Sequence, residues 1–307
     1  MLPRTIGSMA HHFNLIVTTA IASTLATGSI MVFGFSSDLY WAPLGLIGVS
    51  FAVASFPALS RNFAEKNKKE FLSNFSSVFS HIIFLSIPLS FLLFIFRAQI
   101  VRLLYGTRFM GTGYFSWQAT KLTAASLGIL TISVVSGCLV AFLSRVFYSL
   151  CDTKTPVKIA VLCVILNIVF CFLFVYVLQQ ENFFSNFISS FLKVESGIEV
   201  LGLSLALSLS SLLHFFFLYF FLKKKLREIR FDKIVFYKVI TSSFFASLLG
   251  YLSLRVFDFG TQTVVGLFLQ LFLSFIVALC FFLLFSFLLN SKELKETVQS
   301  LKKQFRK

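Results

Sequence analysis

The side chains that could do chemistry are few, and they lie singly within long apolar runs. The polar or small residues that we single out inside these runs are His11, His12, Asn14, Thr18, Gly28, Ser29, His81, Asn167 and His214. They form no Ser/His/Asp set, no carboxylate pair, no metal-ligand spacing and no phosphate loop. We therefore expect no enzyme activity, no metal site and no cofactor. Such residues form interhelical hydrogen bonds, pack closely against a neighbouring helix or line a polar pathway.

Cysteine chemistry is not expected either. Five cysteines fall in or beside the apolar runs without any C-x-x-C pair: Cys138, Cys151, Cys163, Cys171 and Cys280. This pattern indicates small packing residues rather than metal ligands or disulfides.

The elements that carry these residues are predicted by composition. The chain is 57% hydrophobic and 13% charged, with 43 phenylalanines and a mean hydropathy of +0.89, whereas about 25% charge is usual for a soluble domain. Segments without Asp, Glu, Lys or Arg that could cross a bilayer cover 5–37, 39–60, 71–96, 122–144, 159–180, 200–222 and 259–291. A shorter eighth run extends to about 234–256 if Lys238 and Arg255 snorkel to the headgroups. The apolar residues do not alternate as in a barrel, so the sequence predicts an all-α integral membrane protein with about eight transmembrane helices.

Basic residues predict the orientation. With eight spans both termini share one side, and that side collects 21 of the 27 lysines and arginines. By the positive-inside rule, both termini are expected to be cytoplasmic in a multi-pass protein of the inner (plasma) membrane. The net charge of +15 then favours contact with anionic membrane lipids and not with nucleic acid. The first apolar run is longer than a signal-peptide core, so we expect it to remain as a span.

A polar turn interrupts the chain between the fourth and fifth spans. Its sequence, YSLCDTKTPVK, covers residues 148–158. Asp152 and Thr153 favour a turn, Thr155 is predicted as the N-cap, and Pro156 suits the first helical position. Lys154 would then lie at the depth of lipid phosphates, so the segment reads as a capped cytoplasmic hairpin.

Two further segments have the pattern of helices that lie on a membrane surface. Phenylalanines recur at helical spacing in 183–191, with serine and asparagine between them, which predicts an interfacial helix on the outer side. In the tail, Leu294, Val298, Leu301 and Phe305 form one stripe surrounded by lysine and arginine, which predicts a basic amphipathic segment on the inner leaflet.

Several motifs, in this order, resemble the MurJ/MviN family of lipid II flippases. They are MLPRTIG, ASTLATGSI, SSDLYWAPLGLIGVSFAVASFPALS and RVFYSLCDTKTPVK, and the resemblance runs from residue 1 to about 225. It implies a lobe of the MOP-superfamily fold, in which two six-helix lobes and two extra helices carry lipid-linked peptidoglycan precursor across the inner membrane during cell-wall synthesis. Residues 1–222 would be the second six-helix lobe. Residues 223–307 would be the two additional helices and the basic tail. The implied partners are lipid II, or a similar polyprenyl-diphosphate saccharide, and a first six-helix lobe on another chain.

The resemblance also assigns residues. Asp38 and Asn167 are candidates for the substrate pathway by position, and Asn14 joins them as a polar residue of the first span. Arg4 and Arg145 are expected to anchor helix ends, together with the family motif Asp152, Thr153, Lys154, Thr155 and Pro156. Leu39 stands where the family commonly has an arginine. The positions that bind sodium in some members carry Thr18 and Cys171, with Asn167 alone retained.

Three functions follow from these observations. The chain is expected to be part of a lipid II flippase. The alternatives are a non-transporting remnant or scaffold of the same fold, and a flippase for another polyprenyl-linked saccharide.

Overall fold

The computed structural model describes residues 2–106, 117–180, 182–192, 197–226, 233–257, 263–291 and 293–296, and within them the chain is all-helical. In chain order the elements are α1 (Leu2–Ser23), α2 (Ser29–Pro43), the π-helical turn η1 (Leu44–Val49), α3 (Ser50–Ala64), α4 (Lys68–Leu104), α5 (Trp117–Thr131), α6 (Val134–Ser149), α7 (Lys154–Gln179), α8 (Phe183–Leu192), the 3₁₀ turn η3 (Ile198–Val200), α9 (Leu201–Lys225), α10 (Lys233–Val256) and α11 (Val264–Leu288).

Long apolar helices confirm the predicted membrane fold. Among the described residues, six helices are long and apolar enough to cross a bilayer: the continuous α2–η1–α3, α4, α7, α9 with η3, α10 and α11. The pair α5 and α6, bent by 49°, makes a seventh span if it crosses as one unit. α1, with 22 residues, is the remaining helix, so helices are present in all eight predicted runs.

The predicted boundary between the first two spans is wrong. The run 5–37 is not one helix, because α1 ends at Ser23 and α2 begins at Ser29. Between them Gly28 has a φ of 95°, a left-handed conformation that glycine adopts without the steric cost of a Cβ. The turn contains no charged residue, so a search for charge-free windows passes over it.

The fourth span is broken, and serine side chains satisfy the backbone at the break. α5 ends at Thr131 and α6 begins at Val134. The hydroxyl of Ser90 in α4 donates to the Thr131 carbonyl, and that of Ser208 in α9 donates to the Ile129 carbonyl at 3.0 Å. Because no water reaches such carbonyls in hydrocarbon, hydroxyl donors from neighbouring helices make the break tolerable.

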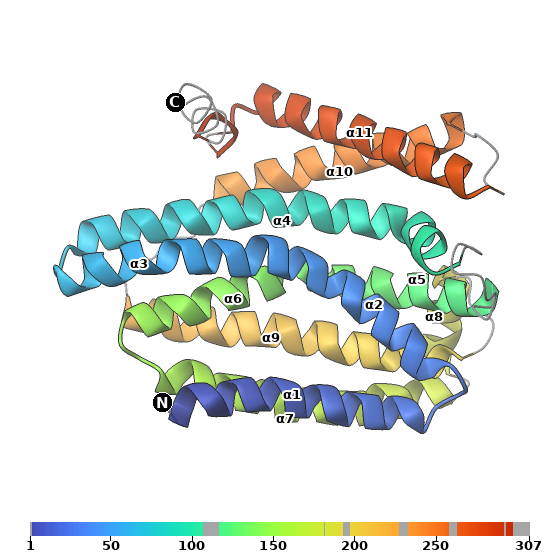
Figure 1. Ribbon diagram of the computed structural model, residues 1–307, viewed down its shortest axis with the longest axis horizontal. Coiled ribbons are helices and arrows are strands. Elements are labelled where there is room, and N and C mark those ends of the chain that lie inside the picture. Colours follow the sequence, from blue (N-terminus) through green and yellow to red (C-terminus); the bar gives the residue numbers. More distant parts are fainter. Residues whose placement is uncertain are drawn as a thin grey trace.

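The helices lie side by side, with the start of α1 and the end of α11 at the same end of the molecule (Figure 1). One apolar cluster joins α3, α4, α6 and α9, and another joins α1, α2, α5, α7 and α9. α10 and α11 pack on α4, where Leu254 and Ala278 meet Leu92 and Phe96. The division at residue 222 stays a prediction.

The structure describes one of the two predicted surface helices in full and only a short part of the other. Residues 183–192 form α8 as expected, while its position at the membrane surface stays a prediction. Most of the expected basic tail lies outside the described residues. The short stretch 293–296 is helical, and Leu294 packs against the cluster around α4.

Candidate functional site

A cavity of about 740 Å³ lies between α1, α2–η1–α3, α6, α7 and α9. Its wall has many polar side chains, although the helices that form it are apolar overall. These residues are Asn14, Thr18, Thr19, Ser37, Asp38, Tyr40, Ser144, Arg145, Tyr148, Ser210, Ser211 and His214. The site therefore offers hydrogen-bonding groups and side chains of both charges among apolar helices.

Helical spacing gathers these groups on one face of each helix. Asn14 and Thr18 lie one turn apart on α1, and Ser210 and His214 lie one turn apart on α9. On α2 a Cβ added to Gly34 would meet no heavy atom within 4 Å. This glycine lines the cavity, so it widens the space beside the neighbouring polar residues.

Three polar atoms on the cavity wall are buried and have no hydrogen-bond partner among the described residues. They are Asn14 Oδ1, Ser37 Oγ and His214 Nε2. A buried polar atom without a partner costs free energy, and most such atoms in proteins are hydrogen-bonded. Their common position around one cavity suits a polar occupant.

Asp38 lies on the wall of this cavity, and its assignment to the substrate pathway stays a prediction. The residue is exposed on the cavity wall and forms no ion pair with any residue that the structure describes. Burial, and then the nearby charge of Asp38, raise the pKa of the Tyr105 phenol just beyond the end of α4. Leu39 points elsewhere, into a small cluster with Val101, Ala124 and Leu127.

Arg145 lies on the cavity wall as well. It is one turn before the end of α6, and its guanidinium lies 6.0 Å from the ring centre of Phe56. No carboxylate in the described part of the chain forms an ion pair with it. Sequence reasoning used only its place at a helix end, and the anchoring role stays a prediction. For Arg4, the structure describes the backbone of α1 but not the side chain.

Asn167 stands behind the wall rather than on it. Its side chain is 1% exposed, its Nδ2 donates to Ser210 Oγ at 3.1 Å, and its Oδ1 accepts from the Cys171 thiol at 3.4 Å. Ser210 in turn lines the cavity. Asn167 therefore holds a wall residue in place. Its assignment to the substrate pathway stays a prediction.

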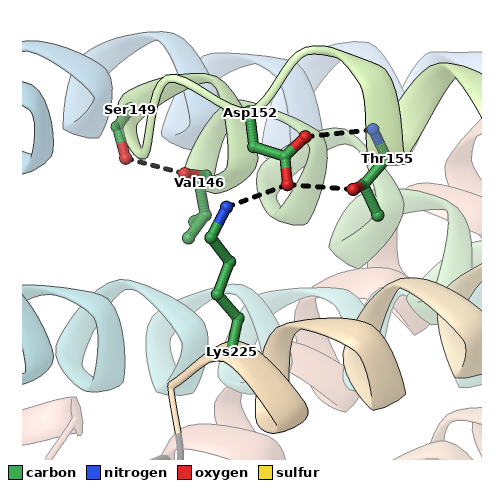
Figure 2. A network of polar contacts seen from close by, with 5 residues as sticks. All are labelled: Val146, Ser149, Asp152, Thr155 and Lys225. Carbon is green, nitrogen blue, oxygen red and sulfur yellow. Dashed lines mark hydrogen bonds and ion pairs between the residues drawn. The ribbon is translucent and has the colours of Figure 1, made fainter.

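The family motif forms a turn that Asp152 caps (Figure 2). One oxygen of its carboxylate accepts the backbone N–H of Thr155 at 3.1 Å, and the other accepts the Thr155 hydroxyl at 2.9 Å. The prediction of Thr155 as N-cap is therefore wrong. α7 begins at Lys154, so Thr153 stands at the N-cap position and Thr155 lies inside the first turn. The Thr153 side chain forms no capping hydrogen bond, and the carboxylate of Asp152, one residue earlier, accepts the free N–H of Thr155 in its place. The prediction of Pro156 as the first helical residue is wrong as well, because it is the third residue of α7. It is buried and lines the cavity.

The same carboxylate joins two helices. Lys225 Nζ, at the end of α9, lies 2.9 Å from Asp152 Oδ2. Partial burial raises the pKa of Asp152, but Lys225 and the two groups of Thr155 outweigh it and hold that pKa below its ordinary value. Thr153 and Lys154 are exposed beside this network.

Two solved transporter structures have a similar arrangement of membrane helices. The fold resembles an outward-facing multidrug transporter of the MATE family at a TM-score of 0.55 and 18% identity, over 96% of this chain and 65% of the other. It resembles more strongly a structure of the lipid II flippase MurJ in an inward closed conformation, with a TM-score of 0.70 and 22% identity over 93% of this chain and 53% of that one. The model of the family described as lipid II flippase MurJ matches residues 1–274. The chain belongs to the MurJ family.

Two curated relatives support membership of this family. A probable lipid II flippase MurJ from Buchnera aphidicola subsp. Schizaphis graminum is 31% identical over 169 residues, which are 54% of this chain and 32% of the relative. The protein of the same description from Vibrio cholerae is 30% identical over 55% of this chain and 31% of its own length. The chain thus spans about a third of the length of the curated relatives it matches.

Proposed function

We propose that this chain forms one half of a lipid II flippase and that the polar cavity is its half of the translocation pathway. The carrying observation is the set of buried, unpartnered atoms of Asn14, Ser37 and His214 around a cavity that also presents Asp38 and Arg145. A polar headgroup crosses about 30 Å of hydrocarbon only along a polar path, because a charge at mid-bilayer costs several kcal/mol.

The cavity residues suit a lipid-linked saccharide diphosphate. An arginine guanidinium forms paired, charge-assisted hydrogen bonds with phosphate oxygens, so Arg145 is the proposed contact for the diphosphate. Asn14, Ser37 and His214 would bond the hydroxyl and amide groups of the headgroup. Transport makes and breaks no covalent bond, so this function needs no catalytic residue and no cofactor.

The other wall of the pathway would come from a first six-helix lobe. The cavity lining belongs to five helices of one lobe, and two-lobed transporters bind substrate between their halves. We further propose that both termini are cytoplasmic and that the basic residues on that side contact anionic lipids, because 21 of the 27 basic residues share it.

The test is complementation of a bacterium depleted of its own flippase. The chain is co-expressed with a six-helix first lobe, as the unchanged sequence, as Arg145→Gln and as Arg61→Gln. Arg61 is exposed near the end of α3, away from the cavity, and serves as the matched control. We expect growth with the unchanged chain and with Arg61→Gln, and loss of growth with Arg145→Gln at equal membrane levels.

Full growth with Arg145→Gln would contradict the proposed diphosphate contact. No growth with any version, despite normal insertion, would favour the non-transporting scaffold. Accumulation of a different polyprenyl-linked saccharide on depletion of this chain would favour the third function.

A further inference from the structure

A second cavity, of about 530 Å³, lies between α4, the α5–α6 break, α9 and α10. Its lining is apolar, with Ile87, Phe91 and Phe94 of α4 on one side and Phe236 of α10 on the other. At its rim Ile132 is 61% exposed and Leu212 is 38% exposed. We call this space the apolar groove.

The polar side chains along the apolar groove already have partners. The Ser90 hydroxyl donates to the Thr131 carbonyl, the Thr131 hydroxyl donates to the Gly128 carbonyl, and the Ser136 hydroxyl donates to the Ser133 carbonyl. Unlike the polar cavity, the groove therefore presents hydrocarbon surface to an occupant. Its interior suits an alkyl chain and not a saccharide.

The apolar groove is separate from the polar cavity. α6 and α9 pack between them, and the hydroxyls of Ser136 and Ser211 lie 3.1 Å apart at that contact. Ser136 lines the groove and Ser211 lines the polar cavity. An occupant of the groove would therefore lie beside the transport pathway and not in it.

A positive charge lies beside the groove. Arg97 Nη1 donates to the carbonyl of Phe94 at 2.6 Å, and its guanidinium carbon lies 4.5 Å from the Phe94 ring centre. The side chain crosses α5 at Gly128, where an added Cβ would lie 2.9 Å from Arg97 Cδ. Within the described residues, Arg97 forms no ion pair with a carboxylate. Gly128 has no side chain and so leaves room for Arg97. The guanidinium of Arg97 is therefore available to an anion from outside the chain.

The length of the groove fits a lipid. Ile83, Ile87, Phe94 and Arg97 follow one stripe of α4. From Ile83 to Phe94 the stripe is about 16 Å long, close to the roughly 15 Å of hydrocarbon in one leaflet. Arg97 lies in the last part of α4, which ends on the side of the molecule opposite to the start of α1. In the predicted topology, this end lies at the headgroups of the leaflet opposite to the chain termini.

We propose that the apolar groove holds one anionic phospholipid, with an acyl chain along α4 and its phosphate on Arg97. The lipid would belong to the leaflet at the Arg97 end. It would fill the space between α4, α9 and α10 and so join the two additional helices to the lobe. The site uses charge complementarity at one end and apolar surface along the rest, as lipid sites between helices do.

Native mass spectrometry of the purified full chain tests this directly. The probes are phosphatidylglycerol and phosphatidylcholine with the same palmitoyl and oleoyl chains, added at equal concentrations. We expect one phosphatidylglycerol bound in preference to phosphatidylcholine. Arg97→Gln should weaken phosphatidylglycerol binding about tenfold, since a hydrogen bond to a charged group is lost, while Arg97→Lys should retain most of it.

Two further variants separate the site from general effects. Arg255→Gln removes an exposed arginine on α10, outside the groove lining, and should bind as the unchanged chain does. Leu212→Trp enlarges a rim residue without overfilling the core and should reduce binding of both lipids. Unchanged preference for phosphatidylglycerol in Arg97→Gln, or an equal loss in Arg255→Gln, would overturn the proposal. Equal melting temperatures confirm that each variant is folded.

Discussion

Lys225 Nζ lies 2.9 Å from Asp152 Oδ2, and this ion pair joins residues that are 73 positions apart in the chain. It ties the end of α9 to the turn before α7, the turn that Asp152 also caps through Thr155. Both helices contribute to the polar cavity, α7 through Pro156 and α9 through Ser210 and His214. The family motif therefore fixes the relative position of two cavity walls.

Removing this network should lower the stability of the chain by a graded amount. Lys225→Gln loses a partly exposed ion pair, worth about 0.2–1 kcal/mol. Asp152→Ala loses the helix cap as well, which adds about 0.5–2 kcal/mol. Melting temperatures in detergent should fall in that order, with Lys224→Gln, an exposed neighbour, as control. An Asp152→Ala variant as stable as Lys224→Gln would contradict the capping role.

The same network predicts a dependence on pH. Because the pKa of Asp152 is lower in the folded chain than its ordinary value, ionised Asp152 stabilises the fold above the unfolded pKa of about 4. That contribution is lost as pH falls through the folded pKa. The difference in melting temperature between the unchanged chain and Asp152→Asn should be constant near neutrality and shrink below about pH 4. A difference that grows on acidification would show that the carboxylate is not stabilised by its partners.

The close approach of the second and fourth spans gives a third prediction. A Cβ on Gly48, in the π-helical turn η1, would lie 2.7 Å from Cys138 Cα in α6, whereas one on Gly45 in the same turn would meet nothing within 4 Å. Gly48→Ala should therefore destabilise the chain by about 1–3 kcal/mol through overpacking. Gly45→Ala should be neutral or slightly stabilising. Thermal denaturation of both variants checks this, and equal effects would argue against direct contact at Gly48.

Orientation is testable with single cysteines in a background without the natural ones. Thr153 is exposed in the turn before α7, and Ser190 is exposed on α8 beyond the other end of that helix. An impermeant thiol reagent added outside whole cells should label Ser190→Cys and leave Thr153→Cys unmodified. The opposite pattern would place the termini outside the cell.

The helices were predictable from the sequence, while the first turn and the rotation of the helices were not. Long apolar runs identify spans because hydrocarbon excludes charge, and helices cover all eight runs, although the run 5–37 contains a turn and the fourth span is broken. The turn at Gly28 was missed because it contains no charged residue. The cap was assigned to Thr155 instead of Asp152 because both residues are good caps, and their hydrogen bonds decide between them.

The candidate site was only partly predictable, because the sequence does not report how each helix is rotated about its axis. Asn14 stood out as a polar residue of the first span and Asp38 was assigned by its position in the family resemblance, and both line the polar cavity. Arg145 looked like a helix-end anchor because it follows an apolar run directly. A side chain at a helix end faces lipid headgroups or a cavity according to the rotation of the helix. The packing of α6 against η1 and α9 sets that rotation, and no local pattern in the sequence reports it.

The most direct test of the central proposal is transport of fluorescent lipid II in liposomes. The purified chain is reconstituted alone and together with a six-helix first lobe, and translocation is read by quenching of the label on the outer leaflet. We predict translocation with both parts, none with the chain alone, and a strong reduction when the chain carries Arg145→Gln. Translocation by the chain alone at the rate of the pair would contradict the claim that its polar cavity is half of a pathway.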